Sequence, residues 1–202
     1  MDRFIAQIKT LRNSIPLNTN HISDIRSDYC NWVIPKRLMC GVYPWLDKPY
    51  AKSNFPLKVD ACQNMSHIIN DGIDTFITLQ FEEPAYPRYA HFALQLNPNT
   101  QFFYFPIVSK RLPQHSIFIN HMSLILDKLI EGKNVFIHCA RGISRTGIYI
   151  VCILMILYGF DSKHALEYTQ YSLNMRRKKE GEITCMNREF ICDFEKFLKF
   201  IG

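Results

Sequence analysis

The chain has 202 residues, of which 48% are hydrophobic and 21% charged, and it carries a net charge of +6. These values are ordinary for a globular protein, and the length suits one domain with a sizeable core. The longest apolar run, 148–158, is too short for the ~20 residues that span a membrane, and the N-terminus lacks the apolar region of a signal peptide. We therefore expect neither a transmembrane segment nor secretion.

The seven cysteines are odd in number and form no Cys-x-x-Cys pair; they are Cys30, Cys40, Cys62, Cys139, Cys152, Cys185 and Cys192. This pattern predicts free thiols in the cytoplasm or another reducing compartment, and it argues against a disulfide framework or a zinc site. No group of histidines or carboxylates has the spacing of metal ligands, so the sequence implies neither a metal nor another cofactor.

The first thirty residues form a segment of their own. Ile5, Ile8 and Leu11 at helical spacing predict a short amphipathic helix, and residues 14–30 are polar and irregular. We interpret residues 1–30 as this helix and a lead-in segment, followed by one domain over 31–202. The helix is expected to pack on that domain, with binding of a partner as the alternative.

Strand and helix signals alternate along residues 31–202. Apolar residues between 59 and 69 predict a helix that ends at Gly72, a glycine in the position of a C-terminal cap. The other expected elements are strands at 73–79, 102–107 and 134–137, a weakly alternating, strand-like run at 92–96, and helices at 117–130, 148–157, 161–173 and 186–200. This order predicts an α/β fold, with a mainly parallel sheet of about four to five strands flanked by helices and a ligand site at the carboxyl ends of the strands.

The most informative segment is 138–147, which reads His-Cys-Ala-Arg-Gly-Ile-Ser-Arg-Thr-Gly and joins an expected strand to an apolar helix. A strand, a tight loop and a helix aim backbone N–H groups at an anion. A cysteine is nucleophilic as its thiolate, and such amides together with Arg145 favour the thiolate of Cys139. The planar fork of Arg145 also matches the oxygens of a phosphoryl group. The segment predicts covalent catalysis through a cysteinyl-phosphate.

Other residues of the segment have supporting roles. Gly142 can adopt backbone dihedrals that are closed to other residues, and it lets the backbone approach the ligand. Thr146 can hydrogen-bond the sulfur and stabilise it as thiolate and as leaving group. His138 is expected to brace the loop through its ring nitrogens and not to act as the base. The phosphate-binding residues are expected to be Ala140, Arg141, Gly142, Ile143, Ser144 and Arg145.

This segment resembles the signature loop, His-Cys-x5-Arg-Ser/Thr, of the cysteine-dependent protein tyrosine and dual-specificity phosphatases. Residues 32–44 are similar to the opening strands of a compact, dual-specificity-like subgroup, and 72–79 to its next strand. The resemblance implies that Cys139 is the nucleophile and Arg145 the phosphate clamp. It also implies hydrolysis of phosphate monoesters, first of all protein phosphotyrosine, with phosphoserine and phosphothreonine as further substrates.

One position departs from the family. There, a strand similar to 105–107 leads into a loop with an aspartate, the general acid that protonates the leaving oxygen; the corresponding residue here is Ser109. General acid catalysis contributes ~10²–10⁴ in rate, and a serine hydroxyl does not supply it. Either another residue donates the proton, or the substrate has a good leaving group, or turnover is slow. The candidates for a substitute acid are Glu82, Glu83 and His115.

Basic residues near the loop bear on the substrate. The run 176–179 is most simply a solvated turn, but Arg141 lies inside the loop, and the pair at 110–111 is expected on the loop opposite. A basic rim suits a substrate with several phosphates, so a phosphoinositide phosphatase or an RNA 5′-triphosphatase on the same loop stays open. A phosphate-binding module without efficient turnover is the second hypothesis, favoured by Ser109 and opposed by the intact Cys139. The oligomeric state stays open.

Overall fold

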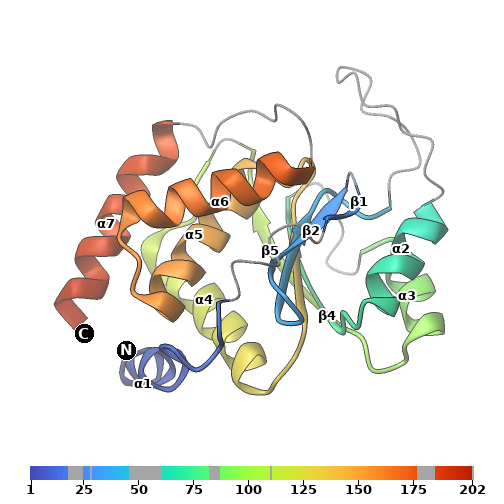
Figure 1. Cartoon of the computed structure of the whole chain (residues 1–202), viewed down its shortest axis with the longest axis horizontal. Coiled ribbons are helices and arrows are strands. Elements are labelled where there is room, and N and C mark those ends of the chain that lie inside the picture. Colours follow the sequence, from blue (N-terminus) through green and yellow to red (C-terminus); the bar gives the residue numbers. More distant parts are fainter. Residues whose placement is uncertain are drawn as a thin grey trace.

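The computed structural model describes residues 1–17, 25–27, 29–45, 61–81, 87–109, 111–176 and 185–201 of the chain. These residues form one sheet with helices on both faces (Figure 1). The strands are β1 (Ile25–Ser27), β2 (Cys30–Ile34), β3 (Leu38–Gly41), β4 (Thr75–Gln80), β5 (Gln101–Ile107) and β6 (Val135–His138). The helices are α1 (Asp2–Leu11), α2 (Ala61–Asn70), α3 (Ala90–Leu96), α4 (His115–Ile130), α5 (Ser144–Tyr158), α6 (Ser162–Arg176) and α7 (Cys185–Ile201).

The sheet has the strand order β1-β2-β3-β6-β4-β5. The four strands β3, β6, β4 and β5 run parallel, whereas β1 and β2 pair antiparallel at one edge. The expected α/β class with a mainly parallel sheet is confirmed, and the three-residue β1 brings the number of strands to six. Because β6 lies between β3 and β4, its carboxyl end is flanked by two parallel neighbours, which is where such sheets bind ligands.

Alternating side chains of the sheet enter two separate cores. Val135 and Ile137 join the larger core, which α4, α5, α6 and α7 cover, and Phe136 between them points to the smaller core under α2 and α3. Helix α5 is apolar all round because it is enclosed: every residue from Arg145 to Leu157 is buried. A buried helix directly after β6 gives the loop between them a rigid support.

Two sequence-based interpretations change. The run 92–96 is not a strand but lies in α3, where Ala90 and Ala93 share the buried face against the smaller core and Leu96 is exposed. Three-residue spacing of these small residues, after a turn closed by the Ala90 N–H and the Pro87 carbonyl, outweighs the weak alternation. The lead-in segment is not irregular throughout, since it contains β1 and the first residue of β2. The expected start of α2 at residue 59 lies outside the described residues.

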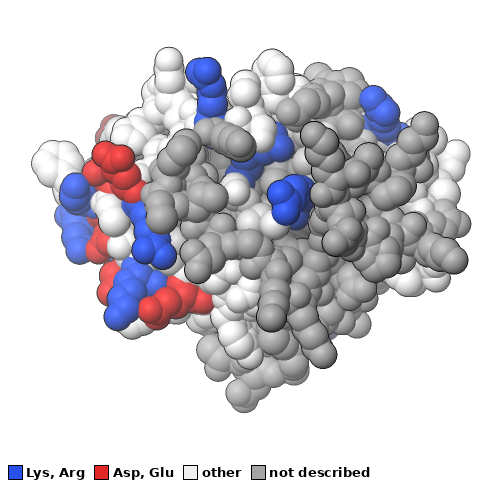
Figure 2. Space-filling model, turned by 90° about the horizontal axis from the view of Figure 1, so that it is seen from above, with Lys and Arg blue, Asp and Glu red and all other residues white. Residues whose placement is uncertain are grey.

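Charged side chains are unevenly distributed over the face seen from above in Figure 2. The described Asp and Glu atoms on this face lie at the left, on the side of α7 in Figure 1. The described Lys and Arg atoms in the middle and at the right have no described Asp or Glu beside them. Among the residues described in this part of the surface, positive charges therefore outnumber negative ones.

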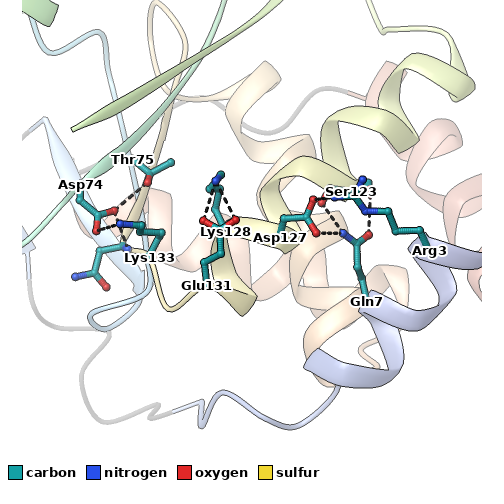
Figure 3. A network of polar contacts seen from close by, with 10 residues as sticks. Arg3, Gln7, Asp74, Thr75, Ser123, Asp127, Lys128, Glu131 and Lys133 are labelled. Atoms are coloured by element: carbon teal, nitrogen blue, oxygen red, sulfur yellow. Dashed lines mark hydrogen bonds and ion pairs between the residues drawn. The ribbon is translucent and has the colours of Figure 1, made fainter. Parts of the chain in front are cut away.

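Helix α1 packs on the domain across α4 and α5. Phe4, Ile8 and Leu11 are buried in the larger core, and the Gln7 amide nitrogen donates to the Ser123 carbonyl at 2.9 Å and to the Asp127 carboxylate (Figure 3). The Ser123 hydroxyl donates to the Gln7 side-chain oxygen at 2.8 Å. The buried face of α1 is thus occupied by its own domain.

Within the described ranges, no helix combines the length and the apolar composition that crossing a membrane requires.

Candidate active site

Backbone hydrogen bonds fix the loop between β6 and α5 at both ends. The Tyr43 N–H donates to the Ala140 carbonyl at 3.3 Å, and the Gly147 N–H donates to the Ile143 carbonyl at 2.7 Å in the first turn of α5. Gly142 has φ +66°, a left-handed conformation that glycine adopts at little cost. Its N–H points at the Cys139 sulfur at 3.2 Å. The loop therefore wraps around the thiol, as expected of an anion-binding turn.

Cys139 is buried, with 3% of its surface exposed. Burial alone raises the pKa of this thiol, but the charge of Arg145, the Thr146 hydroxyl and the N–H groups of Thr146 and Gly142 outweigh it, so the Cys139 pKa is lowered. By contrast, burial without such partners raises the pKa of the Cys152 thiol, in the middle of α5, well above its ordinary value. The two buried thiols thus shift in opposite directions, and the loop favours ionisation of Cys139.

Thr146 is fully buried, and its hydroxyl has no hydrogen-bond partner of ordinary geometry among the described residues. It lies close enough to Cys139 to lower the pKa of the thiol. A buried hydroxyl beside the sulfur is suited to stabilise a thiolate when it forms or leaves.

Arg145 is anchored at the carboxyl ends of two strands. Its Nη1 donates to the Ile107 carbonyl of β5 at 2.7 Å and to the Leu79 carbonyl of β4 at 3.3 Å, and the residue is 9% exposed. These contacts set the plane of the guanidinium beside Cys139, on whose pKa its charge acts. Because a guanidinium carries five N–H donors in a fixed fork, anchoring one nitrogen orients the others.

His138 braces the base of the loop. Its ring is fully buried, and Nε2 lies 2.7 Å from the Tyr89 hydroxyl and 3.1 Å from the Thr78 hydroxyl. Burial lowers the pKa of His138 to about 3; the backbone of Cys139 opposes this, and the charge of Arg145 adds to it. The ring is therefore neutral at physiological pH, which fits a structural support and not a base that takes the thiol proton.

A neutral, buried His138 makes stability depend on pH. The unfolded histidine gains a proton below pH ~6.5, whereas the folded one resists protonation down to a pKa of about 3, so the stabilisation present above pH 6.5 is lost as pH falls. His121, whose pKa is about 4 because of burial, acts in the same direction. We expect His138→Asn to flatten the decline of the unfolding free energy between pH 7 and 4, measured by urea titration. The matched control is His67→Asn, at an exposed histidine of α2. A decline in His138→Asn as steep as in the wild type would contradict the assignment.

The remaining loop residues differ in exposure. Arg141 is exposed and Ile143 is buried, with Ala140 and Ser144 in between. Arg111 on the segment after β5 is exposed too, whereas Lys110 and residues 177–179 lie outside the described residues. Arg37 is not next to the site. Its Nη1 donates at 2.6 Å to the carbonyl of Gly132, a residue beyond the end of α4. Of the basic residues noted in the sequence, Arg141 and Arg111 are the described ones on segments next to the site.

Of the four positions considered for the general acid, Ser109 and His115 lie within the described residues. Ser109 is exposed and lies two residues beyond Ile107, the last residue of β5 and the carbonyl partner of Arg145. His115, at the start of α4, has its ring 5.2 Å from that of Phe190 on α7. Glu82 and Glu83 lie outside the described residues.

Several contacts of the site were not predicted from the sequence. The two carbonyls that anchor Arg145 carry no side-chain signal, and the partners of His138 come from β4 and the start of α3. Tyr43 and Tyr89 are buried and pack against His138, with ring centroids 5.6 Å away. Within the described ranges, no three His, Cys, Asp or Glu side chains form a group that could hold a metal ion.

Several solved structures share this fold. The chain is similar to Tk-PTP in its active form, with a TM-score of 0.56, 20% identity, and 79% of this chain and 92% of that one covered. It is similar to the kinase associated phosphatase carrying a serine for its catalytic-site cysteine, with a TM-score of 0.62, 15% identity, and 80% and 87% covered. It is also similar to PTPMT1 in complex with PI(5)P, with a TM-score of 0.59, 14% identity, and 85% and 97% covered.

No curated protein matches the chain. A family model does: the Swiss Army Knife protein DSP-PTPase phosphatase domain, PTP-SAK, matches residues 27–189. This range begins at the end of β1 and includes the whole sheet core, the loop around Cys139 and the start of α7. The expectation of a compact, dual-specificity-like phosphatase family is confirmed, and the chain belongs to the PTP-SAK family of DSP-PTPase phosphatase domains.

Proposed function

We propose that this phosphatase domain hydrolyses phosphate monoesters through a cysteinyl-phosphate on Cys139, and that its substrate is a protein phosphorylated on tyrosine, with phosphoserine and phosphothreonine as further substrates. The observation that carries the proposal is the buried Cys139 thiol, whose pKa is lowered by the Arg145 charge and by Thr146 and Gly142 against the effect of burial. A thiol with a lowered pKa is more readily ionised, and the thiolate is the form that attacks an electrophile such as phosphorus.

In the proposed first step, the Cys139 thiolate attacks phosphorus, the S–P bond forms, and the bond from phosphorus to the leaving oxygen breaks. Arg145, anchored on Ile107 and Leu79, holds the equatorial oxygens, together with the N–H groups of the loop. In the second step, water attacks phosphorus and the S–P bond breaks. The Thr146 hydroxyl, which lowers the Cys139 pKa, stabilises the departing thiolate, and inorganic phosphate leaves.

The leaving oxygen needs a proton in the first step, and at the expected position the chain has Ser109. An aryl leaving group such as the tyrosine phenolate departs without this proton far more readily than an alkoxide. The missing aspartate therefore supports phosphotyrosine over phosphoserine and phosphothreonine as the better substrate.

Ser109→Asp is expected to raise kcat for alkyl phosphates by roughly tenfold or more, because it restores a carboxylic acid at the end of β5. Rates for a series of aryl and alkyl phosphates should depend steeply on leaving-group pKa in the wild type and less steeply in the variant. Ser116→Asp, an equal charge on an exposed serine at the start of α4, should leave the slope unchanged. A flat slope in the wild type would instead show that another residue donates the proton, and Glu82→Gln, Glu83→Gln and His115→Asn would identify it.

A phosphoinositide is the second candidate substrate. The observations in its favour are the exposed Arg141 and Arg111 next to the site and the excess of described Lys and Arg on the face in Figure 2. PTPMT1, which shares the fold, has been solved with PI(5)P. A polyanionic headgroup would gain from such charges, and this gain should fall as salt screens them.

The test is release of inorganic phosphate from a substrate panel, in the presence of a metal chelator. The panel contains an aryl phosphate, a phosphotyrosine peptide, a phosphoserine peptide, a phosphoinositide and a 5′-triphosphate RNA. We expect the phosphotyrosine peptide to have the highest kcat/KM. Preference for the lipid or the RNA would move the assignment to that substrate. No release at all, with phosphopeptide binding retained, would favour a binding module without turnover.

The free thiols fit the proposed location in the cytoplasm or another reducing compartment. Among the cysteines whose side chains are described, Cys139, Cys152 and Cys192 are free thiols. A thiolate such as that of Cys139 keeps its activity only where oxidation is reversed.

A further inference from the structure

Two hydrogen-bonded side chains, one of them a helical turn after Arg145 in α5, have no role in the proposed chemistry. Tyr149 of α5 is 1% exposed, and its hydroxyl lies 2.7 Å from Nδ1 of His121 on α4. The Tyr149 ring also packs edge-on against Phe118, with centroids 5.0 Å apart. Burial raises the pKa of Tyr149 and lowers that of His121 to about 4, so both groups are neutral and form an uncharged hydrogen bond.

The same histidine contacts β5. The ring of His121 lies flat on that of Phe105, with centroids 4.0 Å apart and an angle of 3° between the planes. Phe105 and Ile107 are two residues apart in β5, both are buried, and both belong to the larger core. His121 therefore packs on the face of β5 that carries Ile107, whose carbonyl accepts from Arg145.

On the helix side, Tyr149 follows Arg145 by four residues, so both side chains lie on one face of α5. The pair thus joins the helix that carries Arg145 to the strand that anchors its guanidinium, with α4 as the connection. A shift of α5 relative to β5 would change the distance between Arg145 Nη1 and the Ile107 carbonyl, which is 2.7 Å.

We infer that His121 and Tyr149 are positioning residues: the bond between them, with the stacking of His121 on Phe105, sets the spacing of α5 and β5 and so the orientation of Arg145 as an oxyanion clamp. This inference rests on the proposed function of Arg145. It assigns a role in phosphate binding to two side chains that touch neither the substrate nor Cys139.

The test uses Tyr149→Phe, which removes the hydroxyl, and His121→Phe, which removes the bond but keeps an aromatic ring on Phe105. The matched control is Tyr158→Phe on the same helix, because the Tyr158 hydroxyl is buried without a partner among the described residues. For each protein we would measure the Kd of tungstate, an oxyanion of phosphate-like shape, by calorimetry, together with kcat/KM for an aryl phosphate and the melting temperature.

We expect Tyr149→Phe and His121→Phe each to weaken tungstate binding and to lower kcat/KM about three- to tenfold, which is the scale of one hydrogen bond. The double variant should lose no more than either single variant, because both substitutions remove the same bond. Tyr158→Phe should match the wild type in both quantities.

Lower melting temperatures with unchanged tungstate affinity would overturn the inference, since the bond would then serve stability alone. A wild type that does not bind tungstate would overturn it as well. If the variants weaken tungstate binding as expected but the wild type hydrolyses no phosphate ester, the proposed function is contradicted and the positioning role stands.

Discussion

Replacing Cys139 with serine is expected to lower hydrolysis of an aryl phosphate by on the order of 10⁴–10⁶. The thiol pKa is lowered by Arg145, Thr146 and Gly142, but a serine hydroxyl ionises at a far higher pH. His138 does not replace the missing activation as a base, because its ring is buried and already engaged with Tyr89 and Thr78. The measurement is release of inorganic phosphate with a chelator present.

Cys192→Ser is the matched control, because it makes the same change at an exposed thiol of α7. This control should retain wild-type rates, and Cys139→Ser should still bind a phosphotyrosine peptide. Undiminished hydrolysis by Cys139→Ser would show that Cys139 is not the nucleophile.

Arg145→Lys is expected to lower kcat/KM by about 10²–10³, even though it keeps a positive charge. Lysine has no planar fork, so it does not bind two phosphoryl oxygens while also donating to the Ile107 and Leu79 carbonyls. The effect should exceed that of Arg141→Ala, because Arg141 is exposed in the same loop. The measurement is steady-state kinetics with an aryl phosphate.

Arg145→Ala adds a pH test. Because the charge of Arg145 lowers the pKa of Cys139, its removal should raise that pKa, and the acidic limb of the kcat/KM profile should move to higher pH. In Arg145→Lys the limb should move less. Near wild-type kcat/KM in Arg145→Lys, or an unmoved limb in Arg145→Ala, would show that Arg145 is not the clamp.

The parts of the fold that follow from local periodicity were predictable. Helix α5 was expected from an unbroken apolar run, and β6 from the short apolar segment before Cys139, because both are enclosed on every side. Helix α3 was missed because its buried residues are the two alanines Ala90 and Ala93, which give a weak signal at either period. The strand order was not predictable, since the pairing of β3 with β6 joins segments about a hundred residues apart.

The site divides in the same way. The roles of Cys139, Arg145 and Thr146 were predicted from one continuous segment, in which residue type and spacing carry the chemistry, and the structure places all three together. The groups that orient them come from other elements: the Leu79 and Ile107 carbonyls at two strand ends, and the Tyr89 hydroxyl from the start of α3. A backbone carbonyl looks the same in every residue, so no sequence pattern could have marked those two positions.

A phosphoryl group on the Cys139 sulfur is the intermediate that the proposed mechanism requires. It can be detected by mass spectrometry of the wild type after mixing with an aryl phosphate and quenching rapidly in denaturant, followed by digestion and mapping. We expect a peptide containing Cys139 that carries one added phosphoryl group, and its disappearance in Cys139→Ser. Turnover without any phosphorylated Cys139, or with the phosphoryl group on another residue, would show that Cys139 is not the nucleophile.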